Sequence, residues 1–208
     1  MKVTFSMLHP DLQQHYKSRR FLSILVKFRW LTKLTNFFIN WRAAGRNIDG
    51  LNCDEVFIPS SDGSWKIRIR IYKPLDQDGP LPILLYFHGG GYILGNPEMS
   101  GEVIKRFIAT RPCVIIAPDY RKAYTKPYPA GFNDCYDTLL WAVRNADRLD
   151  AKADQIIVAG HSAGGGLVAA VTLKARDTRE ADIAFQMPIY PMIDDKQPDD
   201  PSRDIDSP

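Results

Sequence analysis

The sequence predicts an α/β protein with a mostly parallel sheet, and two repeating patterns carry that prediction. Four short runs are apolar almost throughout, which is typical of strands that are covered on both faces; they are residues 83–87, 114–117, 156–159 and 183–187. Between the runs, apolar residues recur every three or four positions, as they do in helices that bury one face. Strand and helix therefore alternate, and this order favours an open sheet with helices on both faces.

The first strands of the sheet follow a different pattern. Residues 56–58 form a short strand candidate, and a Ser-Ser-Asp-Gly turn at 60–63 precedes the next one. From Trp65 to Ile71 apolar residues alternate with Lys66, Arg68 and Arg70. This period of two predicts a strand with one solvated face, as expected for an antiparallel strand near the start of the sheet.

Helical stripes occur in four places. Residues 10–45 read as helical, and the apolar stripe of this segment indicates core packing rather than membrane contact. The other stripes follow the strands of the sheet, and their apolar members are Val103, Ile104, Phe107 and Ile108; Phe132, Tyr136, Leu139, Leu140 and Val143; and Leu167, Val168, Val171 and Leu173. The segment from Asp194 to Pro208 is polar and shows no periodicity.

Composition and charge exclude several classes of partner. The 208 residues are 45% hydrophobic and 25% charged, which is ordinary for a globular protein that folds as one domain. The net charge is +3, although residues 1–50 hold nine Lys and Arg against two Asp. We interpret the basic segment as a solvated helix face, so contact with a membrane surface is not favoured. Zinc spacing and RNA-binding signatures are absent, and we expect no nucleic-acid partner.

The cysteines and the N-terminus bear on location. Cys53, Cys113 and Cys135 are an odd, widely spaced set, which indicates free and mostly buried thiols in a reducing compartment. No compact apolar stretch with a cleavage site opens the sequence, so we expect no secretory signal and a cytoplasmic protein. Residues 21–39 are interrupted by Lys27, Arg29 and Lys33 and make a poor membrane span.

A serine motif, Gly160-His161-Ser162-Ala163-Gly164, follows the apolar run 156–159 directly, and a helical stripe begins after it. This strand-to-helix context is the one required of a G-x-S-x-G nucleophile elbow, in which a sharp turn exposes the serine hydroxyl. Gly160 and Gly164 flank the serine because the turn brings backbone segments close together. The N–H of Ala163 opens the helix and is expected to point to where an oxyanion forms.

A glycine-rich loop, His88-Gly89-Gly90-Gly91, follows the apolar run 83–87. Consecutive glycines let the backbone turn back and present free N–H groups, and this loop fits the oxyanion loop that accompanies the elbow in esterases. An ordinary turn is the alternative; a nucleotide-binding loop is disfavoured because no G-x-G-x-x-G or Lys-Ser/Thr pattern is present. The two motifs together predict acyl transfer, with Ser162 as the nucleophile.

The remaining candidates are four histidines and two acids. We interpret His88 as a structural residue of its loop, and we expect the ring of His161 to point away from the neighbouring hydroxyl. His9 and His15 lie in the N-terminal segment, with no argued route to the serine. Asp194 and Asp195 follow the last strand and could supply an acid, but a loop role is favoured because no histidine follows Ser162 in the sequence.

The motifs resemble those of the hormone-sensitive-lipase-like group of α/β-hydrolases. The resemblance runs from about residue 50 to residue 197 and is carried by HGGG at 88–91, DYR at 119–121, YPA at 128–130, GxSAGG at 160–165 and YPM at 190–192. It implies an α/β-hydrolase fold and a carboxylesterase or lipase activity on short- to medium-chain esters without a cofactor. It also implies that Gly90, Gly91 and Ala163 donate to the oxyanion, with Gly89 shaping and completing the oxyanion hole.

Three departures from the group accompany this resemblance. His161 stands where many members carry an acid, and residues 122–126 replace the usual Leu-Ala-Pro-Glu. The group places its acid and histidine after two further strands, so we expect a C-terminally truncated catalytic domain at 51–208, missing its last strands, behind an N-terminal helical cap at 1–50.

The leading hypothesis is therefore a serine ester hydrolase that forms an acyl-enzyme on Ser162, with a small ester as substrate and neither metal nor cofactor. The polypeptide of 208 residues is expected to be inactive, because a serine without a base is a weak nucleophile. The alternative is a non-catalytic, receptor-like binder of a small molecule on the same scaffold, and a lipase on membrane surfaces is less favoured. An unpartnered apolar strand at 183–187 predicts self-association through the sheet edge.

Overall fold

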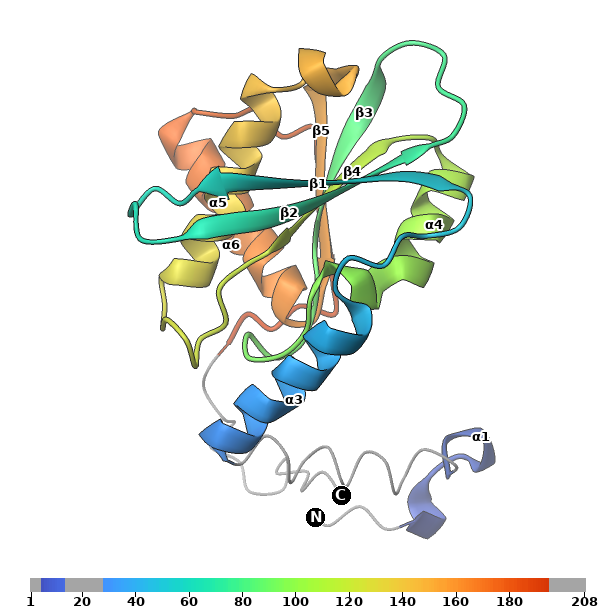
Figure 1. The fold of residues 1–208 in the computed structure, drawn as a ribbon, viewed down its shortest axis with the longest axis vertical. Helices are drawn as coiled ribbons and strands as arrows, with labels where there is room; N and C mark the ends of the chain where they lie inside the picture. The colour runs from blue at the N-terminus through green and yellow to red at the C-terminus, as the bar shows by residue number, and fades with distance from the viewer. Residues whose placement is uncertain (1–4, 14–27, 195–208) are drawn as a thin grey trace. The chain divides into compact units, whose positions relative to one another are not determined.

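The structure is a computed structural model that describes residues 5–13 and 28–194 (Figure 1). The chain divides into two compact units, Met1–Phe38 with Asp194–Pro208, and Ile39–Ile193. The described part of the first unit comprises η1 (Phe5–Met7), α1 (Pro10–Gln13) and the beginning of α3 (Arg29–Ala43). Residues 14–27 of the segment expected to be helical, which include His15, lie outside the described residues, as does Asp195.

The second unit is built on a six-stranded sheet in the order β1-β2-β4-β3-β5-β6. The strands are β1 (Leu51–Pro59), β2 (Lys66–Pro74), β3 (Leu81–Phe87), β4 (Val114–Asp119), β5 (Ala151–His161) and β6 (Phe185–Ile189). β1 and β2 are antiparallel to their neighbours, whereas β4, β3, β5 and β6 run parallel to one another. The expected α/β sheet with an antiparallel start is therefore confirmed.

Helices cover both faces of the sheet, as Figure 1 shows. Side chains of a strand alternate between faces, and β3 illustrates this: Ile83, Leu85 and Phe87 join the larger core with helices α5 (Ala130–Arg144) and α6 (Ala163–Thr178). Leu84 and Tyr86 join the second core, with Ile104 and Ile108 of α4 (Gly101–Thr110). Short 3-10 turns, η2 (Pro97–Ser100) and η3 (Asp147–Leu149), precede α4 and β5. Because both faces of β3 are covered, the strand reads as continuously apolar.

Several strands differ in extent from the sequence prediction. β1 covers nine residues rather than the three expected, because its polar positions pair along the whole of β2. β5 extends to His161, so no linker separates the strand from Ser162. β6 begins at Phe185 and not at Ile183.

The expectation of a solvated face on β2 is wrong. Ile67, Ile69 and Ile71 are buried as expected, but Arg70 on the opposite side is also buried, with 4% of its surface exposed. Arg68 and Arg70 pair with Glu98 of η2 and Glu55 of β1, which cover this face. A period of two cannot distinguish a solvated cation from an ion-paired one, since both alternate with apolar residues.

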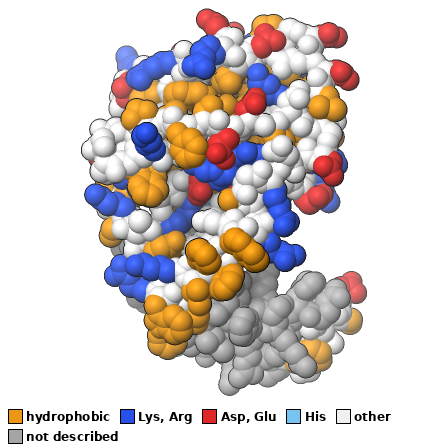
Figure 2. All heavy atoms as spheres, in the orientation of Figure 1, with side chains coloured by type: hydrophobic (Ala, Val, Ile, Leu, Met, Phe, Trp, Pro, Cys, Tyr) orange, Lys and Arg blue, Asp and Glu red, His pale blue; other side chains and the backbone are white. Residues whose placement is uncertain are grey.

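The aromatic residues of α3 also differ from expectation. Thr32 and Asn36 are its buried side chains, whereas its large apolar side chains are exposed; these are Trp30, Leu34, Phe37, Phe38 and Trp41. They fall at helical spacing on one face, and Figure 2 shows hydrophobic side chains over α3 with basic ones beside them. The core packing expected for the apolar stripe is therefore not seen along the described part of it.

Two further observations concern the whole of the described chain. All three cysteines are free thiols, with Cys113 and Cys135 buried. Of the helices in residues 5–13 and 28–194, none combines the length and apolar character that crossing a membrane requires.

Candidate active site

Ser162 occupies a sharp turn between β5 and α6. The strand ends at His161 and the helix begins at Ala163, so the serine alone makes the turn, with φ of 56° and ψ of −120°. A positive φ is strained for a residue with a side chain and persists only where surrounding contacts enforce it. Here the Ser162 N–H donates to Ile189 at 3.0 Å, and its carbonyl accepts from Gly166 at 3.1 Å and Met192 at 3.0 Å. The side chain remains partly exposed.

The two glycines beside the serine lie where a side chain cannot fit. A Cβ at Gly160 would come within 2.6 Å of the Phe87 carbonyl oxygen and 2.7 Å of that of Gly164. A Cβ at Gly164 would overlap the carbonyl groups of Phe87 and His88. The turn is therefore packed directly against the end of β3, where the glycine-rich loop begins.

The glycine-rich loop turns back on itself by conformations that favour glycine. Gly90 and Gly91 have φ of 126° and 61°, and the Gly90 carbonyl accepts from Ile93 at 3.1 Å and Leu94 at 2.8 Å. The N–H groups of Gly90, Gly91 and Ala163 have no acceptor among the described residues. The Gly89 N–H, in contrast, donates to His161 Nε2 at 3.3 Å, so this glycine shapes the loop rather than presenting a free donor.

His161 joins the elbow to β3. Because Nε2 accepts from Gly89, the ring proton resides on Nδ1 and is donated to the Tyr86 hydroxyl oxygen at 2.8 Å. Burial lowers the pKa of His161, which favours this neutral form. Both ring nitrogens are occupied, and no described residue hydrogen-bonds to the Ser162 hydroxyl.

His88 is buried at the start of the loop. Its Nδ1 lies 2.7 Å from the Gly89 carbonyl oxygen and its Nε2 lies 3.2 Å from the Lys122 ammonium. The ring stacks on Tyr120 at a centroid distance of 4.3 Å, and the Tyr120 hydroxyl donates to the His88 carbonyl at 2.8 Å. Burial, and then the charge of Lys122, hold the pKa of His88 well below its usual range.

The loop after β4 is anchored by buried charges. Arg121 and Asp134 of α5 form a bidentate pair, with Nη2 to Oδ1 at 2.7 Å, and Asp134 also accepts from the Arg121 N–H at 2.8 Å. The outer side of the guanidinium donates to Asp62 at 2.7 Å. Hydrogen bonds, first from Ser60 and then from Arg121, lower the pKa of Asp62. This anchor fixes Tyr120 and Lys122 beside the glycine-rich loop.

Three side chains at the site were missed by reasoning from the sequence. The Tyr92 hydroxyl donates to the Met192 carbonyl at 2.9 Å and so ties the glycine-rich loop to the segment after β6. Tyr86 and Lys122 bind the two histidines. Only Lys122 carried a signal, since it stands in the segment that departs from the family pattern.

Two other candidates of the sequence lie in a different compact unit from Ser162. His9 belongs to the first compact unit, and so does Asp194. No group of His, Cys, Asp or Glu within the described ranges is arranged to hold a metal ion.

Comparison with known proteins agrees with this geometry. A family model described as alpha/beta hydrolase fold matches residues 84–207. The carboxylesterase NlhH of Mycobacterium tuberculosis (strain CDC 1551 / Oshkosh) is 36% identical over 130 residues, which are 62% of this chain and 41% of that protein. An arylesterase of Saccharolobus solfataricus is 35% identical over 129 residues, with 62% of this chain and 42% of that protein covered. The chain thus matches less than half the length of these relatives.

Solved structures show the same likeness. A bacterial heroin esterase superposes with a TM-score of 0.71 at 31% identity, covering 89% of this chain and 58% of that one. An arylesterase structure gives a TM-score of 0.73 at 27% identity, covering 91% of this chain and 62% of that one. The family model spans more than half of the sequence, and the chain belongs to the alpha/beta-hydrolase fold family, in its hormone-sensitive-lipase-like group of carboxylesterases.

Proposed function

We propose that this protein is a serine carboxylic-ester hydrolase with Ser162 as nucleophile. The observation that carries the proposal is the strained, partly exposed turn at Ser162, packed against a glycine-rich loop, with free N–H groups on both segments. The names of its relatives, carboxylesterase and arylesterase, support a small ester as substrate.

The reaction follows from these groups. The Ser162 oxygen attacks the ester carbonyl carbon while a base takes its proton, and a tetrahedral oxyanion forms. The N–H groups of Gly90, Gly91 and Ala163 stabilise this oxyanion, and the positive end of α6 adds to their field. The tetrahedral species collapses with loss of the alcohol, and water then hydrolyses the acyl-enzyme.

The base must come from a group other than the two histidines nearest the serine in sequence and fold. Both ring nitrogens of His161 and of His88 are already engaged, so neither accepts the serine proton in this geometry. We propose that an acid and a histidine outside residues 39–193 complete the site, as the serine, acid, histidine order of this scaffold implies. The three free thiols support a reducing, cytoplasmic location for the protein.

The test is hydrolysis of p-nitrophenyl butyrate by the chain of 208 residues and by the product of the coding sequence read beyond codon 208. We expect little turnover from the first and serine-dependent turnover from the second, abolished in Ser162→Ala and retained in Ser64→Ala. Robust turnover by the short form, lost in Ser162→Ala, would contradict the account of the base. Turnover that survives Ser162→Ala would refute the nucleophile.

The engaged histidines also favour one alternative, a receptor-like binder with no catalytic base. In that case the coding sequence has a stop codon after residue 208, and butyrate or a related small acid binds without turnover. Calorimetric titration of the chain with butyrate, in parallel with the hydrolysis assay, separates the two functions.

A further inference from the structure

Lys122 is a buried lysine beside the glycine-rich loop, with 7% of its surface exposed. Its ammonium lies 2.9 Å from Asp119 Oδ1, 2.6 Å from the Tyr120 carbonyl oxygen and 3.2 Å from His88 Nε2. It also lies 4.2 Å from the centre of the Tyr120 ring. An ammonium has three donors and no acceptor, so these three acceptors match it completely.

This contact determines which nitrogen of His88 carries the proton. Because Lys122 can only donate, His88 Nε2 must offer its lone pair, and the ring proton is therefore on Nδ1. Nδ1 lies 2.7 Å from the Gly89 carbonyl oxygen and donates to it. The stacked ring and the hydroxyl of Tyr120 hold the imidazole and its own carbonyl in place.

The Gly89 carbonyl belongs to the same peptide unit as the Gly90 N–H. The unit is planar and trans, so the two groups point in opposite directions. A carbonyl held by His88 Nδ1 therefore aims the Gly90 N–H away from the histidine. On the other side of Gly89, its own N–H is held by His161 Nε2. Gly89 is thus hydrogen-bonded to both imidazoles, through its carbonyl to His88 and through its N–H to His161. The direction of the Gly90 N–H follows from the first of these bonds.

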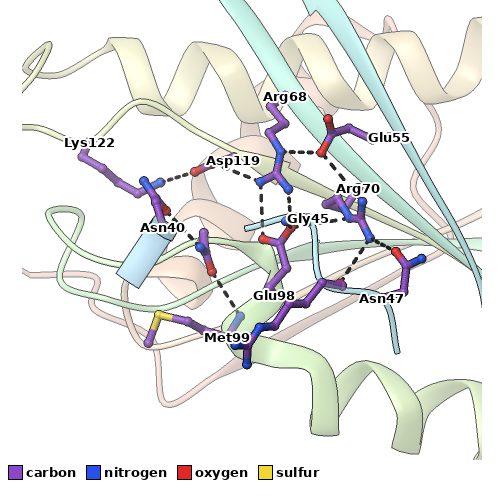
Figure 3. A network of polar contacts seen from close by, with 12 residues as sticks. Asn40, Gly45, Asn47, Glu55, Arg68, Arg70, Glu98, Met99, Asp119 and Lys122 are labelled. Atoms are coloured by element: carbon purple, nitrogen blue, oxygen red, sulfur yellow. Dashed lines mark hydrogen bonds and ion pairs between the residues drawn. The ribbon is translucent and has the colours of Figure 1, made fainter. Parts of the chain in front are cut away.

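The ammonium is itself held in a chain of ion pairs, shown in Figure 3. Asp119 bridges Lys122 to Arg68, which also pairs with Glu55 and Glu98. Glu98 accepts from the Gly45 N–H at 2.8 Å. A buried cation needs a paired carboxylate, and Asp119 supplies it for Lys122. Asp119 and the Tyr120 carbonyl accept two of the ammonium hydrogens, and the third is left for His88.

We propose that Lys122 is a positioning residue for ester hydrolysis, which fixes the Nδ1–H tautomer of His88 and so orients the N–H of Gly90 toward the oxyanion. The orientation part rests on the proposed function, whereas the tautomer does not depend on it.

The first test is NMR of the histidine ring nitrogens in the chain of 208 residues. We expect His88 to be the Nδ1–H tautomer from pH 8 down to pH 5.5. In Lys122→Met, which keeps most of the side-chain length, we expect exchange between tautomers, or protonation of His88 at a higher pH than in the unmutated protein, although burial still lowers its pKa. Lys126→Met removes an exposed lysine four residues away and should leave the His88 signals unchanged. An Nε2–H or doubly protonated His88 in the unmutated protein overturns the proposal whether or not the variants fold.

The second test is kinetic and uses the active form from the extended coding sequence. Loss of an oxyanion donor typically lowers the rate about 100- to 1000-fold, so a misdirected donor should lower kcat by roughly 10- to 100-fold in Lys122→Met. KM should stay within about twofold, because the ground-state ester does not use this donor fully. Lys122→Arg retains a charged donor and should recover part of kcat.

The outcomes separate the two claims. An unchanged kcat in a folded Lys122→Met whose His88 has lost its tautomer overturns the orientation role. Inactivity of every form, with His88 in the expected tautomer, refutes the proposed function but leaves the tautomer assignment standing.

Discussion

The loops that follow β3 and β4 are stabilised in opposite ways. The loop after β3, His88–Gly91, and the elbow are joined through backbone groups that approach closely because side chains are absent at Gly160 and Gly164. The loop after β4, Tyr120–Lys122, is held by charged side chains, above all the buried pair of Arg121 and Asp134. The first arrangement leaves no room for an added side chain, whereas the second depends on the presence of both charged partners.

The largest loss of stability is expected when a single methyl group is added to the elbow. Gly164→Ala places a Cβ against the Phe87 and His88 carbonyls, and backbone atoms cannot move aside as a flexible side chain can. We expect a loss of more than about 4 kcal/mol in the free energy of unfolding, or no folding, as for the most severe packing defects. Urea unfolding followed by circular dichroism measures this loss.

The matched control is Gly101→Ala in α4, where the nearest atoms to an added Cβ lie 3.7 Å away. Alanine is the better helix former, so this variant should be as stable as the original or up to about 1 kcal/mol more stable. Equal stability of the two variants would show that the elbow tolerates a side chain, and would contradict the close packing at Gly164.

The loop after β4 should lose stability when one member of its buried ion pair is removed. Asp134→Ala leaves the Arg121 guanidinium without its buried carboxylate, and breaking such a pair typically costs about 3–5 kcal/mol. The exposed pair of Arg176 and Asp177 is the control, since Asp177→Ala should change stability by less than about 1 kcal/mol. Chemical denaturation of both variants tests this, and comparable losses would contradict the role of burial.

A pH dependence is expected from the two histidines of the glycine-rich loop and the elbow. Burial and Lys122 lower the pKa of His88 in the folded protein, whereas an unfolded histidine titrates near 6.5. Below that pH the unfolded state binds the additional proton, so the free energy of unfolding should fall as the pH drops from 7 to 5.5. His161, with its pKa lowered by burial, contributes in the same direction.

Urea titrations at several pH values measure this fall. The slope should shrink in Lys122→Met, in which His88 no longer faces a cation. A slope that does not change in this variant would show that Lys122 does not set the protonation of His88.

The smallest effect on stability is expected from a substitution in β6, outside both the closely packed elbow and the ion-paired loop. This strand pairs with β5 and has no second partner strand among the described residues, and 57% of Phe185 is exposed. We propose that this edge mediates self-association, as bare apolar edges do. Phe185→Lys should change stability by less than about 0.5 kcal/mol and should reduce the concentration-dependent mass seen by light scattering. A monodisperse monomer at all concentrations before mutation would refute the association.

The difference between the loops also explains what the sequence could predict. Gly160, Gly164 and the serine between them were recognisable because a backbone approach requires glycine at fixed positions, and the order of strands followed from the apolar runs. The partners of His88 and His161 were not recognisable, since Lys122 and Tyr86 reach them only through the side-by-side arrangement of β3, β4 and β5. Arg70 was expected in solvent because its ion pairs come from Glu98, far away in the sequence.

The central position of β3 has a consequence for how the chain is made. During synthesis β3 emerges before both of its neighbours, since β4 and then β5 are still to be translated. Both edges of β3 therefore remain unpaired until β4 and β5 have been made. Pairing between strands that are far apart in the sequence is slow and prone to aggregation. The loop that β3 carries can reach its final shape only once the ribosome has delivered His161, so the site would be among the last parts of this domain to form.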